Sequence, residues 1–501
     1  MRRILTVAQM READTYTINE KNEPSLTLMY RAGEALANEA ENLVSQGEVL
    51  CVCGGGNNGG DGYVCAEILR ERGREVTVVC VGESKSADNE YYKQRFIEAG
   101  GRIEKAFPEN KFSLVVDCLL GTGFYGAPKG ECAVAIERIK AYKTDGAKVL
   151  SADIPSGLNG DNGQKSLCVE ADVTLCIGEE KTGVYYGEGV DVAGKVVRKD
   201  IGIVLPNEEY ATIIQKEDVA KLLPKRKRNT HKGDYGRVAI IGGSAQYFGA
   251  GYLSAYAGLR SGAGYTYLYV PQSILGYYVL KNPEMIIRPL DGRGARGMCE
   301  TLDGLLSMQA IAYGMGMGVT KEVCEGAKQL LNTYTGSLLL DADALNALAK
   351  YEKGNIVSIF ANKKCEVVLT PHVKEFSRLT GDSIEEILEK GMFAPVAFAK
   401  QCAVTVLLKG AVTTVTDGER IAVNIAGSAG QAKGGSGDAL SGLIAGLLAQ
   451  GLDVFDGAVA GAYLLGRSAE NVEKTVGEYG MLATDIINGL GQVFNELHGA
   501  E

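Results

Sequence analysis

Short apolar runs alternate along the first half of the chain with longer segments whose apolar residues recur at helical spacing. Continuous runs of Val, Leu and Cys are typical of strands buried on both faces, so they predict a mostly parallel sheet between helices. The opening segment, Val7 to Val44, is predicted to be helical. The predicted strands of this half are Glu48–Cys53, Glu75–Gly82, Ser113–Asp117, Lys148–Asp153 and Asp172–Gly178.

This alternation stops after Val204, where a polar and charged stretch is punctuated by Pro206 and Pro224. A second α/β series follows, with predicted strands in RVAIIGG, YTYLYV, AIAYG, SLLLDAD, CEVVLTP, VTVLLKG and VTTVTDG. The 501 residues also exceed the length at which one core stops growing, roughly 250–300 residues. We therefore expect two α/β domains, each a three-layer α/β/α arrangement, over residues 1–215 and 225–501.

Composition narrows the classes of partner. The formal net charge is -10, and an acidic chain gains nothing from a phosphate backbone, so we expect no nucleic-acid partner. The 12 cysteines include no CxxC pair, which favours a reducing, cytoplasmic location. We recognise no signal peptide or membrane-spanning run, and expect no membrane partner. With three histidines and no HExxH motif, zinc chemistry of that type is excluded.

The segment Gln431 to Gly451 is predicted to be a glycine loop that runs into a buried helix. Gly434, Gly435 and Gly437 let the backbone turn its N–H groups toward one point, at the positive end of the helix. Such a loop binds anions. Asp438 lies at its mouth, where a carboxylate could take a proton from a hydroxyl that attacks a bound phosphate.

A second glycine loop, Gly54–Gly62, follows a strand and opens a helix in the first half. It formally satisfies GxGxxG, so a nicotinamide dehydrogenase is an alternative, with Glu83 near the place of the ribose-binding acid. However, the loop also carries Asn57, Asn58 and Asp61, whose polar groups suit direct contact with a ligand or cation better than a plain pyrophosphate turn.

Further polar side chains follow two other predicted strands of this half. Asp117 ends one strand, and Asp153 and Ser156 follow another. Ligands of open α/β sheets bind at the carboxyl ends of the strands. Each aspartate alone could be a turn residue or a helix cap. Together with the glycine loop, they favour one shared pocket at this sheet edge.

In this order, GGGNNGGDG, VVDCLLGTG and DIPSG resemble the N-terminal NAD(P)H-hydrate epimerase domain, over roughly residues 1–210. The resemblance implies a Rossmann-like fold and a potassium ion held by Asn58, Asp117 and Ser156, whose oxygens suit such a cation. It implies that Asp153 is the acid/base that helps to invert the hydroxyl-bearing carbon. The implied hydrate pocket comprises Asn57, Asn58, Gly59, Gly60, Asp61, Gly121, Thr122, Gly123, Phe124, Tyr125, Gly126, Ala127 and Asp153.

The second half resembles the ADP/ATP-dependent NAD(P)H-hydrate dehydratases of the ribokinase-like superfamily, over roughly residues 225–501. The resemblance is carried by HKGDYGRVAIIGGSAQYFGA, LDADALN, LTPHVKEFSRLTG, LLKGAVT and QAKGGSGD, in this order. Both halves together match the family of bifunctional NAD(P)H-hydrate repair enzymes. The resemblance of the second half implies a ribokinase-like fold for it, with Mg²⁺ and ADP or ATP as cofactors and NAD(P)H hydrate as substrate.

Hydroxide is a poor leaving group. After phosphoryl transfer to the hydroxyl of the hydrated nicotinamide, the same oxygen can leave as part of phosphate, which is a good leaving group. Asp438 would accept the hydroxyl proton during the transfer. The resemblance implies nucleotide contacts from Lys409, Gly410, Ala411, Val412, Thr413, Gly434, Gly435, Ser436 and Gly437. It implies that the hydrate is contacted in this half by Ala250, Gly316, Gly318, His372 and Asp438.

Several alternatives remain open at this point. The chain could be a ribokinase-type small-molecule kinase whose first half only binds or scaffolds. Lys409 could be a solvated strand-end charge, His372 a structural residue, and Asp343 or Asp438 a helix cap. Lys374 stands where the family usually has glycine, so it could fill or charge the substrate wall. The choice between ADP and ATP, the preferred hydrate and any transfer between sites stay open. We expect a homo-oligomer.

Overall fold

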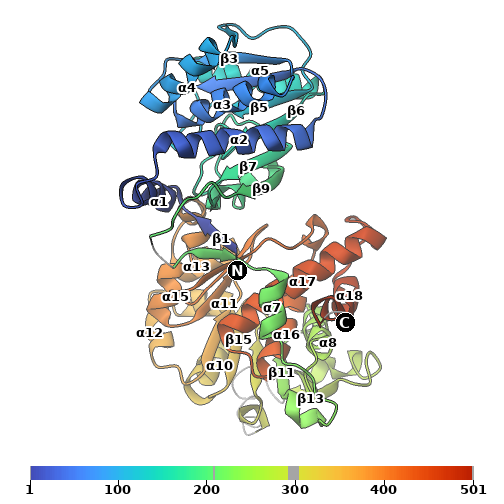
Figure 1. Ribbon diagram of the computed structural model, residues 1–501. Helices are drawn as coiled ribbons and strands as arrows, with labels where there is room; N and C mark the ends of the chain where they lie inside the picture. The colour runs from blue at the N-terminus through green and yellow to red at the C-terminus, as the bar shows by residue number, and fades with distance from the viewer. Residues whose placement is uncertain (1, 207–208, 291–303, 499–501) are drawn as a thin grey trace. The chain divides into compact units, whose positions relative to one another are not determined.

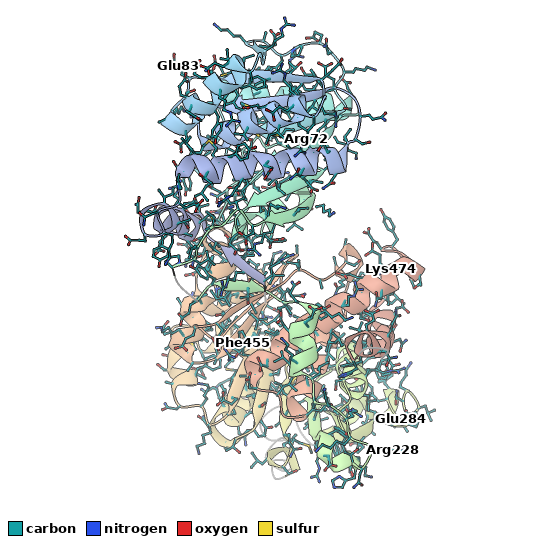
Figure 2. All side chains as sticks on the ribbon, viewed as in Figure 1. Arg72, Glu83, Arg228, Glu284, Phe455 and Lys474 are labelled. Atoms are coloured by element: carbon teal, nitrogen blue, oxygen red, sulfur yellow. The ribbon has the colours of Figure 1, made fainter. Side chains whose placement is uncertain are left out.

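The computed structural model describes residues 2–206, 209–290 and 304–498. It consists of two compact units, Arg3–Tyr210 and Ala211–Glu501 (Figure 1). We call them the first and the second unit. No helix in the described ranges is long and apolar enough to cross a bilayer. Charged side chains such as Arg72 and Glu83 project from the surface of the first unit (Figure 2).

The first unit is built on a parallel sheet in the order β4-β3-β2-β5-β6-β7-β9. Two short strands, β1 and β8, are not part of this sheet and pair in parallel with one another. The strands are β1 (Arg2–Leu5), β2 (Val49–Gly54), β3 (Val76–Val81), β4 (Ile103–Glu104), β5 (Leu114–Cys118), β6 (Lys148–Ala152), β7 (Val173–Ile177), β8 (Glu180–Lys181) and β9 (Lys195–Lys199). The helices are α1 (Val7–Asn19), α2 (Ser25–Leu43), α3 (Asn57–Glu71), α4 (Ala87–Glu98), α5 (Glu131–Thr144) and α6 (Gly189–Val192).

Helices cover both faces of this sheet. One core contains side chains of α2, α3 and α4, and the core on the other face contains side chains of α5. Strands β3 and β4 lie on one side of β2, whereas β5 and the strands that follow it in the sequence lie on the other side. The strand order therefore reverses between β2 and β5, which is the point where open α/β sheets bind ligands.

The second unit contains a longer mixed sheet in the order β13-β12-β11-β14-β15-β16-β17-β18-β19-β10. Its strands are β10 (Ala211–Ile213), β11 (Arg237–Ile241), β12 (Tyr265–Pro271), β13 (Ile286–Leu290), β14 (Ala310–Tyr313), β15 (Ser337–Leu340), β16 (Glu366–Leu369), β17 (Thr405–Leu408), β18 (Thr413–Thr416) and β19 (Ile421–Asn424). Strands β11 to β17 pair in parallel, and β18 runs antiparallel to both neighbours.

Two helical layers cover this second sheet. On one face lie α7 (Lys216–Leu222), α8 (Phe248–Arg260), α16 (Ser436–Ala449), α17 (Val454–Val476) and α18 (Ala483–His498). On the other lie α10 (Lys321–Thr333), α11 (Asp343–Tyr351), α12 (Ile356–Ala361), α13 (Val373–Thr380), α14 (Ile384–Lys390) and α15 (Val396–Cys402). Phe455 of α17, labelled in Figure 2, is buried in the first of these layers.

The close packing of α16 against α8 depends on small residues. A Cβ atom at Gly442 would lie 1.8 Å from the carbonyl oxygen of Ser254 in α8. The helix backbones therefore approach one another more closely than any larger side chain allows. This packing fixes the start of α16, and with it the predicted anion loop.

The α/β/α class expected from the sequence is confirmed in both units, with two local differences. The segment Val7 to Val44 is interrupted, because α1 ends at Asn19 and Pro24 precedes α2. Residues 211–215 were expected in the first domain, but β10 pairs with β19 and α7 packs against α17, so these contacts belong to the second unit. The first unit therefore ends at Tyr210.

Candidate active sites

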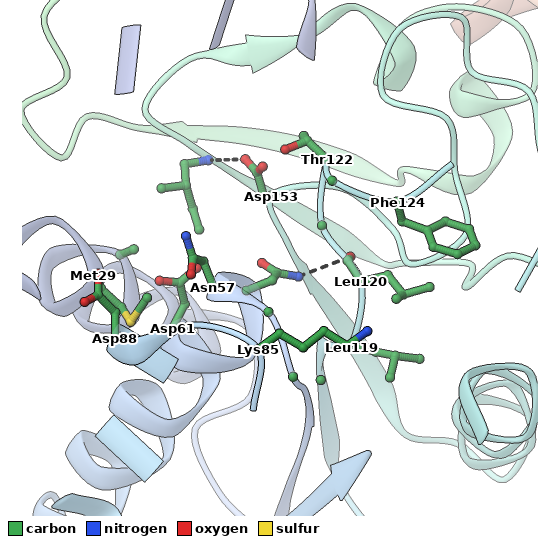
Figure 3. A pocket seen from close by; sticks show the side chains of 18 of the residues that line it. Met29, Asn57, Asp61, Lys85, Asp88, Leu119, Leu120, Thr122, Phe124 and Asp153 are labelled. Atoms are coloured by element: carbon green, nitrogen blue, oxygen red, sulfur yellow. Dashed lines mark hydrogen bonds between the residues drawn. The ribbon is translucent and has the colours of Figure 1, made fainter. Parts of the chain in front are cut away.

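The first unit contains a cavity of about 760 Å³ at the carboxyl edge of its sheet, where β2 and β5 diverge (Figure 3). Of the predicted pocket residues, Asn57, Asn58, Asp61, Gly121, Thr122, Gly123, Phe124 and Asp153 line it. Gly59 and Gly60 lie beneath the lining, where their missing side chains let α3 approach Gly54 and Met29. Tyr125, Gly126 and Ala127 continue the loop beyond the lining residues.

The three side chains predicted to hold potassium lie close together, Asn58 in the lining of this cavity and Asp117 and Ser156 buried next to it. Asp117 is fully buried and accepts hydrogen bonds from the Ser156 hydroxyl at 2.6 Å, the Ser156 backbone N–H at 2.9 Å and Ser151 Oγ at 2.9 Å. The Asn58 amide donates to the Leu120 carbonyl at 3.2 Å. Burial raises the pKa of Asp117, and its hydrogen bonds oppose part of that rise.

Asp153 forms an ion pair with Lys181, a residue that the sequence analysis did not single out (Figure 3). The Lys181 side chain is only 1% exposed, and its ammonium also donates to the Ile177 carbonyl at 2.7 Å. Burial by itself lowers the pKa of Lys181, but the charge of Asp153, its hydrogen bond and smaller contributions from other neighbours together raise the pKa above its usual value. Asp153 has a φ of 67°, an uncommon backbone conformation for a residue other than glycine.

Two more carboxyl groups face this ion pair from helices. Burial raises the pKa of Asp61, in α3, well above its ordinary value, and the charge of Asp153 adds to the rise. Burial raises the pKa of Asp14, in α1, to about 6, while Lys181 lowers it and Asp153 raises it. The cavity thus holds carboxyl groups whose tendencies to lose a proton differ, as proton-transfer chemistry requires.

The second unit gathers its candidate residues at the carboxyl ends of β15, β16 and β17. Asp341 follows β15 and is buried, with Lys409 Nζ at 2.9 Å and Ser441 Oγ at 2.7 Å from its carboxylate oxygens. Burial by itself lowers the pKa of Lys409, but the charges of Asp341 and Glu375 outweigh it and raise the pKa above its usual value. Lys409 is therefore a paired, charged group and not a solvated strand end.

Asp438 lies beside this pair, in the first turn of α16. Burial and the charge of Asp341 raise its pKa to about 6, and Lys409 opposes the rise. Gly435 precedes the helix with a φ of 100°, and a Cβ at Gly437 would lie 3.5 Å from Lys409 Nζ. The hydroxyl of Ser436 is buried without a hydrogen-bond partner among the described residues. The first-turn N–H groups of a helix also lack partners within the helix, so this loop can bind an anion.

The predicted contacts to the hydrate in this unit fall into two places. A Cβ at Gly316 would lie 2.8 Å from Cβ of Ala250, so these two residues touch. The Gly318 N–H donates to Asp343 at 2.7 Å, which ties the loop after β14 to the start of α11. Of the residues predicted to hold the nucleotide, Gly410 and Ala411 are exposed in the turn after β17, and Val412 is buried.

His372 has a structural role at the start of α13. Its Nδ1 accepts hydrogen bonds from the backbone N–H groups of Lys374 and Glu375, and the Glu375 carboxylate accepts one in return from the His372 N–H. The imidazole is nevertheless about half exposed. The predicted contact with the hydrate stays a prediction, and the side chain of Lys374 is exposed.

Sequence reasoning missed Asp14, Lys181, Asp341 and Ser441. Asp341 directly follows a predicted strand, so the signal that selected Asp117 and Asp153 could have found it. Ser441 lies within an apolar helix pattern, and Asp14 and Lys181 belong to no recognised motif. Only their packing brings them to the sites.

The first unit is doubly wound and has a cavity lined with ionisable side chains. The second unit is an α/β unit with an anion loop beside a carboxylate. Together they define a two-site enzyme that acts on small molecules. Residues 238–491 match the family described as NAD(P)H-hydrate dehydratase, and residues 25–183 match the YjeF-related protein N-terminus. A ribokinase-like superfamily protein of Enterococcus faecalis, 24% identical, shares the fold, with a TM-score of 0.51 over 58% of this chain and 98% of that chain.

Relatives of known name match almost the whole chain. The bifunctional NAD(P)H-hydrate repair enzyme of Moorella thermoacetica is 33% identical over 99% of this chain and 97% of that protein. The Escherichia coli enzyme of the same name is 33% identical over 93% and 89%. The ADP/ATP-dependent NAD(P)H-hydrate dehydratase of Bacillus subtilis, co-crystallised with ATP and Mg²⁺, is 29% identical, with a TM-score of 0.50 over 57% of this chain and 98% of that chain. The chain belongs to the family of bifunctional NAD(P)H-hydrate repair enzymes.

The Asp341–Lys409 pair yields a stability prediction. We expect Asp341→Asn to destabilise the second unit by about 3 kcal/mol, because it leaves a mostly buried ammonium without its charged partner. Hydrogen exchange of the α16 amides in increasing urea measures this unit separately from the first.

The double variant Asp341→Asn/Lys409→Met serves as the control. It removes both charges, so it should recover part of the loss. An Asp341→Asn variant as stable as the parent chain would contradict the assigned pairing.

Proposed function

We propose that this chain repairs hydrated reduced nicotinamide dinucleotides in two steps. The first unit interconverts the R and S epimers of NAD(P)H hydrate. The second unit dehydrates the S epimer to NAD(P)H, with ADP or ATP as phosphoryl donor. Support comes from the full-length relatives of that name and from the two sites described above.

The observation that carries the dehydratase step is Asp438 at the mouth of a glycine loop, beside Lys409. Its carboxylate takes the hydroxyl proton while the hydroxyl oxygen attacks the terminal phosphate of the nucleotide. The phosphorylated oxygen then leaves as phosphate, and the ring regains its double bond. The N–H groups of Gly434 to Gly437 stabilise the charge that develops on the moving phosphoryl group.

The nucleotide is held by the turn after β17 and by the glycine loop. Lys409, already charged through Asp341, attracts phosphate oxygens. Mg²⁺ bound with the nucleotide supplies further positive charge at the phosphates. The Bacillus subtilis dehydratase, which crystallised with ATP and Mg²⁺, supports this cofactor pair.

In the first unit, potassium would be held by Asn58, Asp117 and Ser156. The donor set fits, because hydrogen bonds join these groups in a row: Asp117 to Ser156, Ser156 to the Leu120 carbonyl, and that carbonyl to the Asn58 amide. Such oxygens suit a hard monovalent cation. The ion would complete the floor of the cavity, and Asp153 would move the proton during inversion.

Two further expectations, on cellular location and on oligomeric state, belong with this proposal. The described cysteines are all free thiols, which fits a reducing compartment such as the cytoplasm. The chain would act as a homo-oligomer, and its molar mass in solution tests this.

The first prediction about activity concerns the base of the dehydratase. Asp438→Asn should keep nucleotide binding but lower dehydration at least about 10²-fold, because the amide cannot accept the proton. In the parent chain the rate should fall as the pH drops through about 6, where Asp438 takes up a proton. The return of reduced-nicotinamide absorbance measures both effects.

Glu366→Gln is the matched control. Glu366 lies at the start of β16, at the end of the strand away from the site, so this variant should leave the rate unchanged. Free phosphate should form in step with NAD(P)H. A stable phosphoester would instead support the alternative, a ribokinase-type kinase with an inert first half. Unchanged turnover in Asp438→Asn would refute the assigned base.

The second prediction concerns the epimerase. With an equal mixture of epimers and excess nucleotide, the parent chain should convert all of the hydrate, whereas Asp153→Ala should stall near half. The substitution also unpairs Lys181, so the dehydration rate of pure S epimer should be measured to show that the second unit stays intact. Complete conversion at the parental rate by Asp153→Ala contradicts this role.

The third prediction concerns potassium. Replacing potassium by tetramethylammonium should slow epimerisation without affecting dehydration of the S epimer. Ser156→Ala should raise the potassium concentration needed for half-maximal epimerisation at least about tenfold, because one ligand is lost. Epimerisation that is equally fast in both salts argues against the ion.

A further inference from the structure

Helix α1 presents Asp14 to the cavity of the first unit, although the matched family segment of this unit begins only at residue 25. The helix is firmly fixed. Thr6 and Gln9 form a capping box at its start, and the Val7 N–H donates to Asp161 at 2.7 Å. Near its end, the Thr17 hydroxyl accepts from the Val204 N–H at 2.9 Å. The position of Asp14 is therefore determined by packing and not by a loose N-terminal arm.

One stripe of this helix faces the cavity. Met10, Arg11, Asp14 and Ile18 line it, and their spacing places them on adjoining faces of a helix. Among the described residues, no donor forms a hydrogen bond with the Asp14 carboxyl group. Its proton is therefore free to pass to a group bound in the cavity.

The electrostatic surroundings favour a neutral Asp14 in weakly acidic solution. Burial raises the pKa of its carboxyl to about 6, Lys181 lowers it and Asp153 raises it. Asp153 is instead held by an ion pair with the Lys181 ammonium and by a hydrogen bond that its carboxylate accepts from the Ile177 N–H at 3.1 Å. In weakly acidic solution, up to a pH of about 6, a carboxylic acid and an ion-paired carboxylate can thus coexist in one cavity.

The chemistry of the hydrate requires such a pair. Water adds to an enamine double bond with its oxygen on the carbon next to nitrogen, so the hydroxyl-bearing carbon is bonded to the ring nitrogen. Inversion at this carbon needs one group that gives a proton and one that accepts a proton. Asp153 alone fills only one of these roles at a time.

We propose that Asp14 is the second proton-transfer residue of the first site, and that it works together with Asp153 on the hydroxyl-bearing carbon. This inference rests on the epimerase function proposed above. Asp14 gives its proton to the hydroxyl oxygen, the C–O bond breaks with its electron pair on the departing water, and the nitrogen lone pair forms a C=N bond. A water molecule then adds to the other face, the C=N electron pair returns to nitrogen, and Asp153 takes the proton of that water.

One proton has then moved from Asp14 to Asp153, and exchange with solvent or reverse turnover restores the starting state. Other charged groups also line the cavity. They lie on α1, in the loop before α4, on α4 itself and around the start of α5, and they are Arg11, Lys85, Asp88, Lys129 and Glu131. Asp61 also faces the pair, and its burial raises its pKa well above the ordinary value of an aspartate.

The experiment measures how fast the full chain converts pure R epimer into the S epimer. Nucleotide is left out, so that only epimerisation occurs. Asp14→Asn should lower kcat at least about 10²-fold. The rate of the parent chain should fall as the pH rises through about 6, because Asp14 loses its proton, and this fall should be absent in Asp14→Asn. Asp14→Glu, which keeps the acid, should retain the fall and recover part of the rate.

Folding can be separated from catalysis. The raised pKa means that Asp14 favours folding when protonated, below its ordinary pKa of 3.8, and that this contribution is lost as the pH rises through about 6. At pH 8 the neutral Asp14→Asn chain should therefore melt no lower than the parent. Glu12→Gln, on the exposed side of the same helix, is the matched control and should change neither rate nor pH profile.

Two results overturn the inference: an Asp14→Asn rate within about twofold of the parent, or a loss confined to KM with the pH profile intact. A parent chain that fails to invert pure R epimer is a different outcome, because it contradicts the proposed epimerase function itself. The parental measurement separates these two failures.

Discussion

A buried ion pair between an aspartate and a lysine lies at the carboxyl edge of the sheet in each unit. In the first unit it joins Asp153 to Lys181, and in the second it joins Asp341 to Lys409. Removing two charges from water is costly, and such pairs persist only where further hydrogen bonds satisfy both partners. The Ile177 backbone and the Ser441 hydroxyl supply these bonds. Each pair thus fixes a charged group at the place where its sheet binds ligands.

Burial and neighbouring charges also set the pKa of a third ionisable group at each site. Burial and a neighbouring aspartate raise the pKa values of Asp14 and Asp438 to about 6, and the nearby lysine limits the rise. A carboxyl group with a pKa near the working pH exchanges protons efficiently in both directions. The two units have different sheets and different helices, yet in both an ion pair adjusts the pKa of a neighbouring carboxyl group, which suits the proton transfers that we propose for them.

Sequence patterns were sufficient where the signal is local. Continuous apolar runs located the strands β2, β5 and β6, and residues directly after strands or glycine loops, such as Asp117 and Asp438, were recognised as site candidates. Lys181 could not be found in this way, because its role depends on a side chain that crosses from β8 to Asp153. Asp14 lies far from every motif and reaches the cavity only because α1 packs against distant parts of the chain. His372 was selected as a contact to the hydrate, which stays a prediction, and the sequence did not show that its Nδ1 caps α13.

The glycines of the two loops serve different physical ends, and this distinction bears on the GxGxxG pattern of the first unit. A Cβ at Gly59 would lie 1.8 Å from the carbonyl oxygen of Gly54, so this glycine allows α3 to pack closely against β2. A Cβ at Gly434 would meet no atom within 4 Å, so nothing in the fold itself requires glycine there. A bare backbone at an open helix start serves an anion that must approach closely. Most glycines of the first loop thus serve close packing, although Gly56 also meets no atom within 4 Å. In the second loop, Gly434 leaves the start of α16 open, which favours the approach of a phosphate in the second unit.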